Sequence, residues 1–275
     1  MKGVKQLVFS WVRDKELVYL QIEEFFGFDI KAYFTSRIGG VSTGKYDSLN
    51  LGLHTADHKE SVLKNRKLLA ESIGIEPDNF TAAEQIHGDN IYNVDSRDRG
   101  SGALDYQNSI AGVDALITDK AGIPLISFYA DCVPLYFVEP EKKIIALAHA
   151  GWKGTVKEIG KKTISAMKDK YDIKPGDIWV AIGPSISRDF YQVDDNVVER
   201  FKEHFPDFRE FIVDKGKGQY LLDLWQANIS SMKRAGIEDK HIILSNYCTF
   251  SNEEYFYSYR RDNKKTGRMA SIIYF

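Results

Sequence analysis

The chain has 275 residues, enough for one large domain or two small ones. Apolar residues make up 43% and charged residues 28%, close to the globular average, which excludes disordered and collagen-like classes. Lysine plus arginine total 37 and aspartate plus glutamate 39, so a net charge of −2 excludes the strong positive field typical of nucleic-acid and anionic-membrane binding.

The lack of a recognisable targeting signal and the small number of cysteines both favour the cytoplasm. No stretch reaches the roughly 18 consecutive apolar residues of a membrane span. The apolar run near the N-terminus is shorter than the core of a signal peptide, about 7–15 residues. The two cysteines, Cys132 and Cys248, are too few for a secreted disulfide scaffold. We therefore predict a cytoplasmic protein that keeps its thiols reduced and binds neither membrane nor nucleic acid.

Local patterns predict more strands than helices. In chain order they predict strands at residues 17–22 and 30–35, a glycine-rich loop at 36–53, a helix at 59–73, strands at 90–95, 114–118, 124–130, 135–138 and 143–148, a helix at 155–171, a strand at 178–182, helices at 195–205 and 222–235, and strands at 242–245, 255–259 and 269–274. Strands that come in runs favour an α+β fold over a regular βαβ repeat. No internal repeat or flexible linker divides the chain, so we predict one domain over residues 1–275.

A cysteine directly follows one of these apolar strands. Cys132 stands in the segment ADCVP, beside Asp131 and before a proline, where the backbone leaves the sheet. Loops at strand ends commonly carry functional groups. The alternative interpretation is a buried structural thiol, because free cysteines are often inert core residues.

Two histidines lie in short segments that contain glycines. The strand at 143–148 leads into His149 of HAGWKG, where glycines let the backbone turn tightly before a helix whose free N–H groups could hold an anion. His87 lies in EQIHG and is followed by a glycine. For both residues, a hydrogen-bonded histidine without a chemical role is the alternative.

Taken together, the three side chains form a stronger pattern. One cysteine and two histidines supply three metal ligands and leave a fourth position open, the number typical of a catalytic zinc. Zinc held in this way lowers the pKa of a bound water to about 7. The same residues could act without metal, with Cys132 as a thiolate nucleophile and His149 as its base. The residues alone leave both interpretations open.

Two segments are candidates for anion binding. Ser36, Arg37 and Ser42 belong to TSRIGGVS, where backbone N–H groups and a guanidinium suit phosphate or carboxylate. Arg260 and Arg261 stand side by side in YSYRRD and point to opposite faces if that segment is a strand. Ordinary solvated loops are the alternative for both segments.

These segments, in order, resemble one protein family. The motifs are TSRIGGVS, SLNLGLH, EQIHG, GVDALITD, ADCVPL, HAGWKGT, IGPSIS, LDLWQAN, YSYRRD and TGRMAS, and they run from Thr35 to the C-terminus. The set is similar to the YfiH/YlmD-type family, also known as laccase-domain or multicopper polyphenol oxidase proteins, to which human FAMIN is related. QxHG, ADC and HAGW are its most diagnostic motifs.

The resemblance implies a fold, a metal site and an activity. The fold consists of packed mixed β-sheets flanked by helices, similar to the catalytic domain of cytotoxic necrotizing factor. The family's metal, usually zinc with copper as the alternative, falls on His87, Cys132 and His149. Members are described as purine nucleoside phosphorylases that act on adenosine, inosine and methylthioadenosine and that also deaminate adenosine. Purine nucleosides and phosphate are therefore the expected partners of a monomer or homodimer.

The sequence departs from the family pattern in two places. Lys153 replaces a more common arginine and loses its bidentate geometry, and residues 185–187 read SIS where relatives often have cysteines. For the deaminase activity, the neighbouring Asp131 is a candidate proton carrier.

Three other functions remain as alternatives. The first is a hydrolase that edits peptidoglycan precursors with Cys132 as nucleophile, and the second is a metal-binding protein without activity. The third is copper-dependent polyphenol oxidation. We discount its multicopper form, because six histidines are fewer than the roughly ten that several coppers need.

Overall fold

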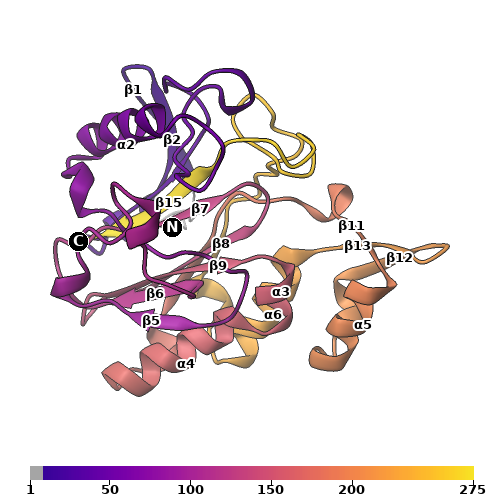
Figure 1. Ribbon diagram of the computed structural model, residues 1–275. Coiled ribbons are helices and arrows are strands. Elements are labelled where there is room, and N and C mark those ends of the chain that lie inside the picture. The colour runs from indigo at the N-terminus through magenta and orange to yellow at the C-terminus, as the bar shows by residue number, and fades with distance from the viewer. Residues whose placement is uncertain (1–8) are drawn as a thin grey trace, which may run out of the picture.

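The computed structural model describes residues 9–275, which form two six-stranded sheets, a three-stranded sheet and surrounding helices (Figure 1). The first sheet has the order β1 (Phe9–Asp14), β2 (Leu17–Ile22), β3 (Lys31–Thr35), β15 (Met269–Tyr274), β7 (Leu125–Tyr129) and β4 (Thr81–Ala82). The second has the order β14 (Ile242–Leu244), β10 (Trp179–Ile182), β8 (Val133–Glu139), β9 (Ile144–Ala150), β6 (Ala115–Thr118) and β5 (Ile91–Asn93). The third has the order β11 (Gln192–Asp194), β13 (Gln219–Leu222) and β12 (Ile212–Gly216).

Parallel and antiparallel pairs occur together in both large sheets. The pairs β4·β7, β5·β6 and β10·β14 are parallel, whereas pairs such as β8·β9 and β15·β7 are antiparallel. The predicted α+β fold with packed mixed sheets is therefore confirmed. The predicted single domain over residues 1–275 includes residues 1–8, which lie outside the described part of the chain.

The two large sheets pack against each other around a shared core. One cluster of buried side chains includes Phe34 and Tyr129 of the first sheet and Tyr136 and Leu147 of the second. The hydroxyl of Tyr136 donates a hydrogen bond of 2.8 Å to the carbonyl of Tyr33 across the sheets. The consecutive strands β7 and β8 belong to different sheets. The short turn between them therefore lies where the two sheets join.

Helices cover the outer faces of both sheets. In Figure 1, α2 (Lys59–Ile73) lies above the first sheet, and α4 (Ile159–Tyr171) and α6 (Leu224–Arg234) lie below the second. The helix α5 (Asp195–His204) accompanies the three-stranded sheet at one side, α3 (Trp152–Val156) precedes α4, and α1 (Glu23–Phe26) follows β2. None of the helices within residues 9–275 combines the length and hydropathy of a transmembrane segment.

Two predicted elements are wrong. The spacing predicts one helix over residues 155–171, but α3 ends at Val156 because Glu158 adopts a left-handed conformation with φ of 56°, and α4 begins after it. The composition predicts a strand at residues 255–259, but the structure has turns and irregular backbone there. Ser258 and the backbone N–H of Arg260 donate hydrogen bonds to the carboxylate of Asp131 instead of joining a sheet.

Candidate metal centre and its pocket

Three metal-binding side chains meet at the junction of the two large sheets. The ligand atoms of His87, Cys132 and His149 all lie within 4.8 Å of one another. Cys132 occupies the turn between β7 and β8, and His149 lies near the end of β9. His87 follows β4 in a loop and has a positive φ of 59°. The structure thus brings together the three residues that the sequence predicts as one site.

Asp114, just before β6, connects two members of this triplet. Its carboxylate accepts hydrogen bonds from His149 Nδ1 at 2.8 Å, from the backbone N–H of His87 at 3.0 Å and from that of Gly88 at 2.6 Å. Its carbonyl also accepts the backbone N–H of His149 at 2.8 Å. The contact with Nδ1 leaves Nε2 of His149 as its metal-binding nitrogen, an arrangement common around metal-bound histidines. Sequence reasoning missed Asp114, although the GVDALITD motif contains it.

Charges within the triplet favour a thiolate. Burial raises the pKa of the Cys132 thiol, but the charge of His149 and hydrogen bonds from both histidines outweigh burial and bring that pKa well below its ordinary value. Burial lowers the pKa of His149, and the Cys132 thiolate together with Asp114 outweighs this effect and raises it. A thiolate is both the metal-binding form of cysteine and its nucleophilic form.

This donor set fits zinc. Thiolate and imidazole are ligands that zinc prefers, and three protein ligands leave one position for water or substrate. The carboxylate behind His149 is a further feature of such sites. Within residues 9–275, no other group of three histidine, cysteine or acidic residues lies close enough to share an ion. The described residues thus offer ligands for one such metal rather than for several coppers.

Gly151 allows the close approach of two ligands. A Cβ atom at this position would lie 3.0 Å from Cys132 Sγ and 3.2 Å from His87 Cδ2. We expect Gly151→Ala to displace these side chains and to raise the Kd for zinc about tenfold or more, measured by competition with a chromophoric chelator. Gly176→Ala is the matched control, since its nearest contact would be an ordinary 3.5 Å to Glu238. Equal zinc affinity in the two variants would contradict the expectation.

The triplet opens into a cavity of about 460 Å³. This volume is in the usual range for small-molecule sites. His87 and Cys132 form part of its wall, and His149 is buried beside them. The remaining wall includes aromatic and cationic side chains, namely Trp152, Tyr191, Tyr259, Arg260 and Lys264.

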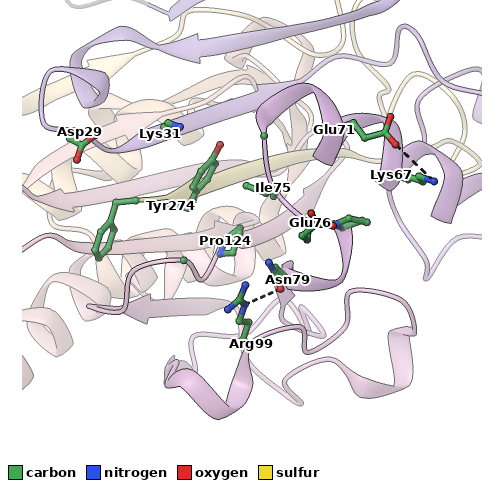
Figure 2. A pocket seen from close by; sticks show the side chains of 14 residues that line it. Asp29, Lys31, Lys67, Glu71, Ile75, Glu76, Asn79, Arg99, Pro124 and Tyr274 are labelled. Atoms are coloured by element: carbon green, nitrogen blue, oxygen red, sulfur yellow. Dashed lines mark hydrogen bonds and ion pairs between the residues drawn. The ribbon is translucent and has the colours of Figure 1, made fainter.

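A larger cavity of about 910 Å³ has a different character. Figure 2 shows that charged residues line it, with Lys67 paired to Glu71 and Arg99 hydrogen-bonded to Asn79. Neither histidine nor cysteine is among its lining residues, and it shares none of them with the triplet cavity. Of these two cavities, the triplet cavity is therefore the one that has reactive side chains, His87 and Cys132, in its wall.

The anion-binding residues predicted from TSRIGGVS lie outside the triplet cavity. Ser36 and Ser42 are buried, and their hydroxyls donate hydrogen bonds of 2.6 and 2.7 Å to a backbone carbonyl and to a carboxylate. Arg37 donates two hydrogen bonds to the carbonyl of Asp47 and lines a separate cavity of about 430 Å³. These polar groups connect the loop to β2, to Asp57 and to its own backbone at Asp47.

The two neighbouring arginines have different surroundings. Arg261 donates to the carbonyls of Thr249, Phe250 and Phe256, so its guanidinium is held within the protein. Arg260 lines the triplet cavity, with its guanidinium carbon 5.0 Å from the ring centre of Tyr191. Of the five predicted anion-binding residues, Arg260 is the one that shares a cavity with the triplet.

Known proteins resemble this chain over most of its length. Residues 31–275 match the family described as multi-copper polyphenol oxidoreductase laccase. The purine nucleoside phosphorylase YlmD of Geobacillus stearothermophilus is 42% identical over 247 residues, which cover 88% of this chain and 89% of the relative. The protein of the same name from Bacillus subtilis is 39% identical over 246 residues, which cover 89% of this chain and 88% of the relative.

Solved structures agree with this assignment. The crystal structure of YlmD from Geobacillus stearothermophilus has a TM-score of 0.92 at 39% identity and covers 97% of this chain and 98% of that one. The hypothetical protein YfiH from Bacillus licheniformis also has a TM-score of 0.92, at 36% identity, and covers 96% of this chain and 98% of that one. The chain therefore belongs to the laccase-domain family of YlmD- and YfiH-type proteins, as its motifs indicate.

Proposed function

We propose that this protein is a purine nucleoside phosphorylase that acts on adenosine, inosine and methylthioadenosine. The observation that carries the proposal is the convergence of His87, Cys132 and His149 on a cavity with aromatic and cationic walls. Relatives named purine nucleoside phosphorylase, which cover almost nine-tenths of the chain, support the same reaction. Phosphorolysis needs a planar base, a ribose and a phosphate in one pocket, and this cavity offers surfaces for each.

The cavity walls suggest where the substrates bind. Trp152, Tyr191 and Tyr259 offer aromatic faces on which a purine can stack. Arg260 and Lys264 supply positive charge for phosphate, with the guanidinium suited to two hydrogen bonds at once. During the reaction, a phosphate oxygen forms a bond to C1′ of the ribose while the C1′–N9 bond breaks. The departing purine takes the electron pair of that bond, and hydrogen-bond donors in the cavity offset its charge.

The triplet would hold the metal in this account. When zinc is bound to His87, Cys132 and His149, it supplies a Lewis acid and a water of lowered pKa beside the substrates. Asp114 keeps the proton on Nδ1 of His149 and thereby directs Nε2 towards the metal. The backbone N–H groups that bind Asp114 fix the loop of His87 in the same place.

We place adenosine deamination second at the same cavity. Zinc deaminases use a carboxylate that carries protons and does not bind the metal. Asp131 is the one carboxylate among the described residues that line this cavity, but hydrogen bonds from Thr249, Ser258 and Arg260 already occupy both of its oxygens, which makes it a poor proton carrier. We therefore expect adenosine to give inosine more slowly than it gives adenine.

Base release with and without phosphate tests the proposal. Zinc-loaded protein incubated with each of the three nucleosides should release free base and ribose 1-phosphate only when phosphate is present, as followed by chromatography. No release of base from any of them by zinc-loaded protein would overturn the proposal. Phosphate-independent hydrolysis of a peptidoglycan precursor that stops after thiol alkylation would then favour the editing hydrolase.

Arg260 should act mainly on phosphate binding. We expect Arg260→Gln to raise the KM for phosphate about 10- to 100-fold, because a charge-assisted hydrogen bond contributes about 1.5–3 kcal/mol. The KM for adenosine should change much less. Arg209→Gln, which removes an exposed arginine outside the cavity, is the control and should leave both constants unchanged. A KM for phosphate that is unaltered by Arg260→Gln would assign phosphate to other residues.

A further inference from the structure

One irregular segment, the 258–265 loop, forms walls of three neighbouring cavities. Four of its residues line the triplet cavity, namely Tyr259, Arg260, Asn263 and Lys264. Arg260 also lines a cavity of about 550 Å³ beside β11 and β13, and Asn263 also lines the cavity that contains Arg37. The position of this loop therefore sets the shape of the triplet cavity and the place of its cationic groups.

The loop contains neither helix nor strand, so its position depends on side-chain contacts. The carboxylate of Asp131 supplies two of them. Its Oδ2 accepts hydrogen bonds from Ser258 Oγ at 3.0 Å and from the backbone N–H of Arg260 at 2.7 Å. Its Oδ1 accepts the hydroxyl of Thr249 at 2.7 Å. One buried carboxylate thus connects the turn between the large sheets with two segments near the C-terminus.

The backbone of Asp131 is unusual in a way that suits this contact. Its φ is +88°, in a region that non-glycine residues seldom adopt, and the residue is only 8% exposed. The next residue along the chain is Cys132, whose thiol belongs to the triplet. The backbone here directs the side chain of Cys132 into the triplet and that of Asp131 to the 258–265 loop. It therefore couples the wall formed by the triplet to the wall formed by the loop.

We propose that Asp131 is a positioning residue whose carboxylate fixes the 258–265 loop relative to Cys132 and so sets where Arg260 meets the substrates. The loop contacts stand by themselves, and the kinetic consequence rests on the proposed phosphorylase function. This role differs from that of a proton carrier. A proton carrier needs an oxygen that faces the reacting base, whereas both oxygens of Asp131 accept hydrogen bonds from the protein.

The first variant is Asp131→Asn, which keeps the size of the side chain but removes the negative charge that strengthens the hydrogen bonds from Ser258, Thr249 and Arg260. In zinc-loaded protein without substrate, we expect backbone hydrogen exchange in residues 258–265 to become about tenfold faster. The KM values for phosphate and adenosine should rise about tenfold, with kcat within a few-fold of wild type and zinc per chain unchanged. Asp239→Asn, which removes an exposed carboxylate paired with Lys233 away from the cavity, is the control and should alter none of these.

Ser258→Ala keeps the test decisive if Asp131→Asn fails to fold. It removes one donor to the carboxylate and leaves Asp131 in place, so exchange in the loop and both KM values should change in the same direction by a smaller factor. Unchanged exchange and unchanged KM values in Ser258→Ala would overturn the proposal. So would an Asp131→Asn protein that loses kcat a hundredfold with normal loop exchange, because that result identifies a proton carrier.

The exchange measurement also separates this proposal from the proposed function. Faster exchange in both variants, with no base release by the wild-type protein, would uphold the anchoring role of Asp131 while overturning the phosphorylase. If the wild-type protein is an active phosphorylase but loop exchange is normal in both variants, the phosphorylase is upheld and the anchoring role of Asp131 is overturned.

Discussion

Cys132→Ala is expected to lower phosphate-dependent base release from adenosine by about a thousandfold or more, the scale on which loss of a group at the reacting centre acts. The variant leaves two imidazoles where three ligands converge, so zinc binding should weaken by at least about a hundredfold. Zinc per chain, measured by mass spectrometry after dialysis, and adenine release, followed by chromatography, check the two effects in the same samples.

Cys248→Ala is the matched control for this loss. The Cys248 thiol is buried, accepts a hydrogen bond from the backbone N–H of Ser187 and does not line the triplet cavity. We expect this variant to keep its zinc and its rate. A Cys132→Ala protein with the turnover of the wild type would place the chemistry outside the triplet.

Asp114→Asn is expected to weaken zinc binding by about 10–100-fold and to lower kcat/KM by a similar factor, the range known for residues that hydrogen-bond to metal ligands. An amide can accept from some of the donors that meet at Asp114, but its N–H₂ group would face at least one N–H. His149 and the loop of His87 would then lose their common support. A zinc titration against a competing chelator measures the change.

Asp119→Asn provides the control for that variant. Asp119 stands five residues later in the same motif but pairs with Lys120 at the surface, so its loss should leave the zinc affinity unchanged. Should Asp114→Asn bind zinc as tightly as Asp119→Asn, the support assigned to Asp114 would be wrong.

Local sequence patterns predicted the elements around the site better than their arrangement. The bounds of α2 are the predicted 59–73, and the strands on both sides of Cys132 were expected. The sequence did not predict that these two strands enter different sheets. The alternation of apolar and polar residues along a strand indicates which residues are buried, but not which strand it pairs with. The placement of Cys132 at the junction of the sheets depends on that partner choice.

Metal-binding side chains at strand ends and turns were the informative signal for the site. His87, Cys132 and His149 stood out in this way, and the structure places their ligand atoms together. Asp114 gave no such signal, since a buried carboxylate beside a strand resembles any polar residue in a turn. Arg37 gave a different signal, that of a cation in a glycine-rich loop, and the structure places it outside the triplet cavity with its guanidinium donating to the carbonyl of Asp47.

The most direct test of the account is stepwise zinc loading of metal-free protein, with phosphate-dependent adenine release measured at each step. If the triplet is the one active centre, the rate should rise in proportion to bound zinc and level off at one zinc per chain, while Cys132→Ala neither retains zinc nor gains activity. Full adenine release from metal-free wild-type protein would contradict the zinc-dependent account and leave the thiolate of Cys132 to act without metal.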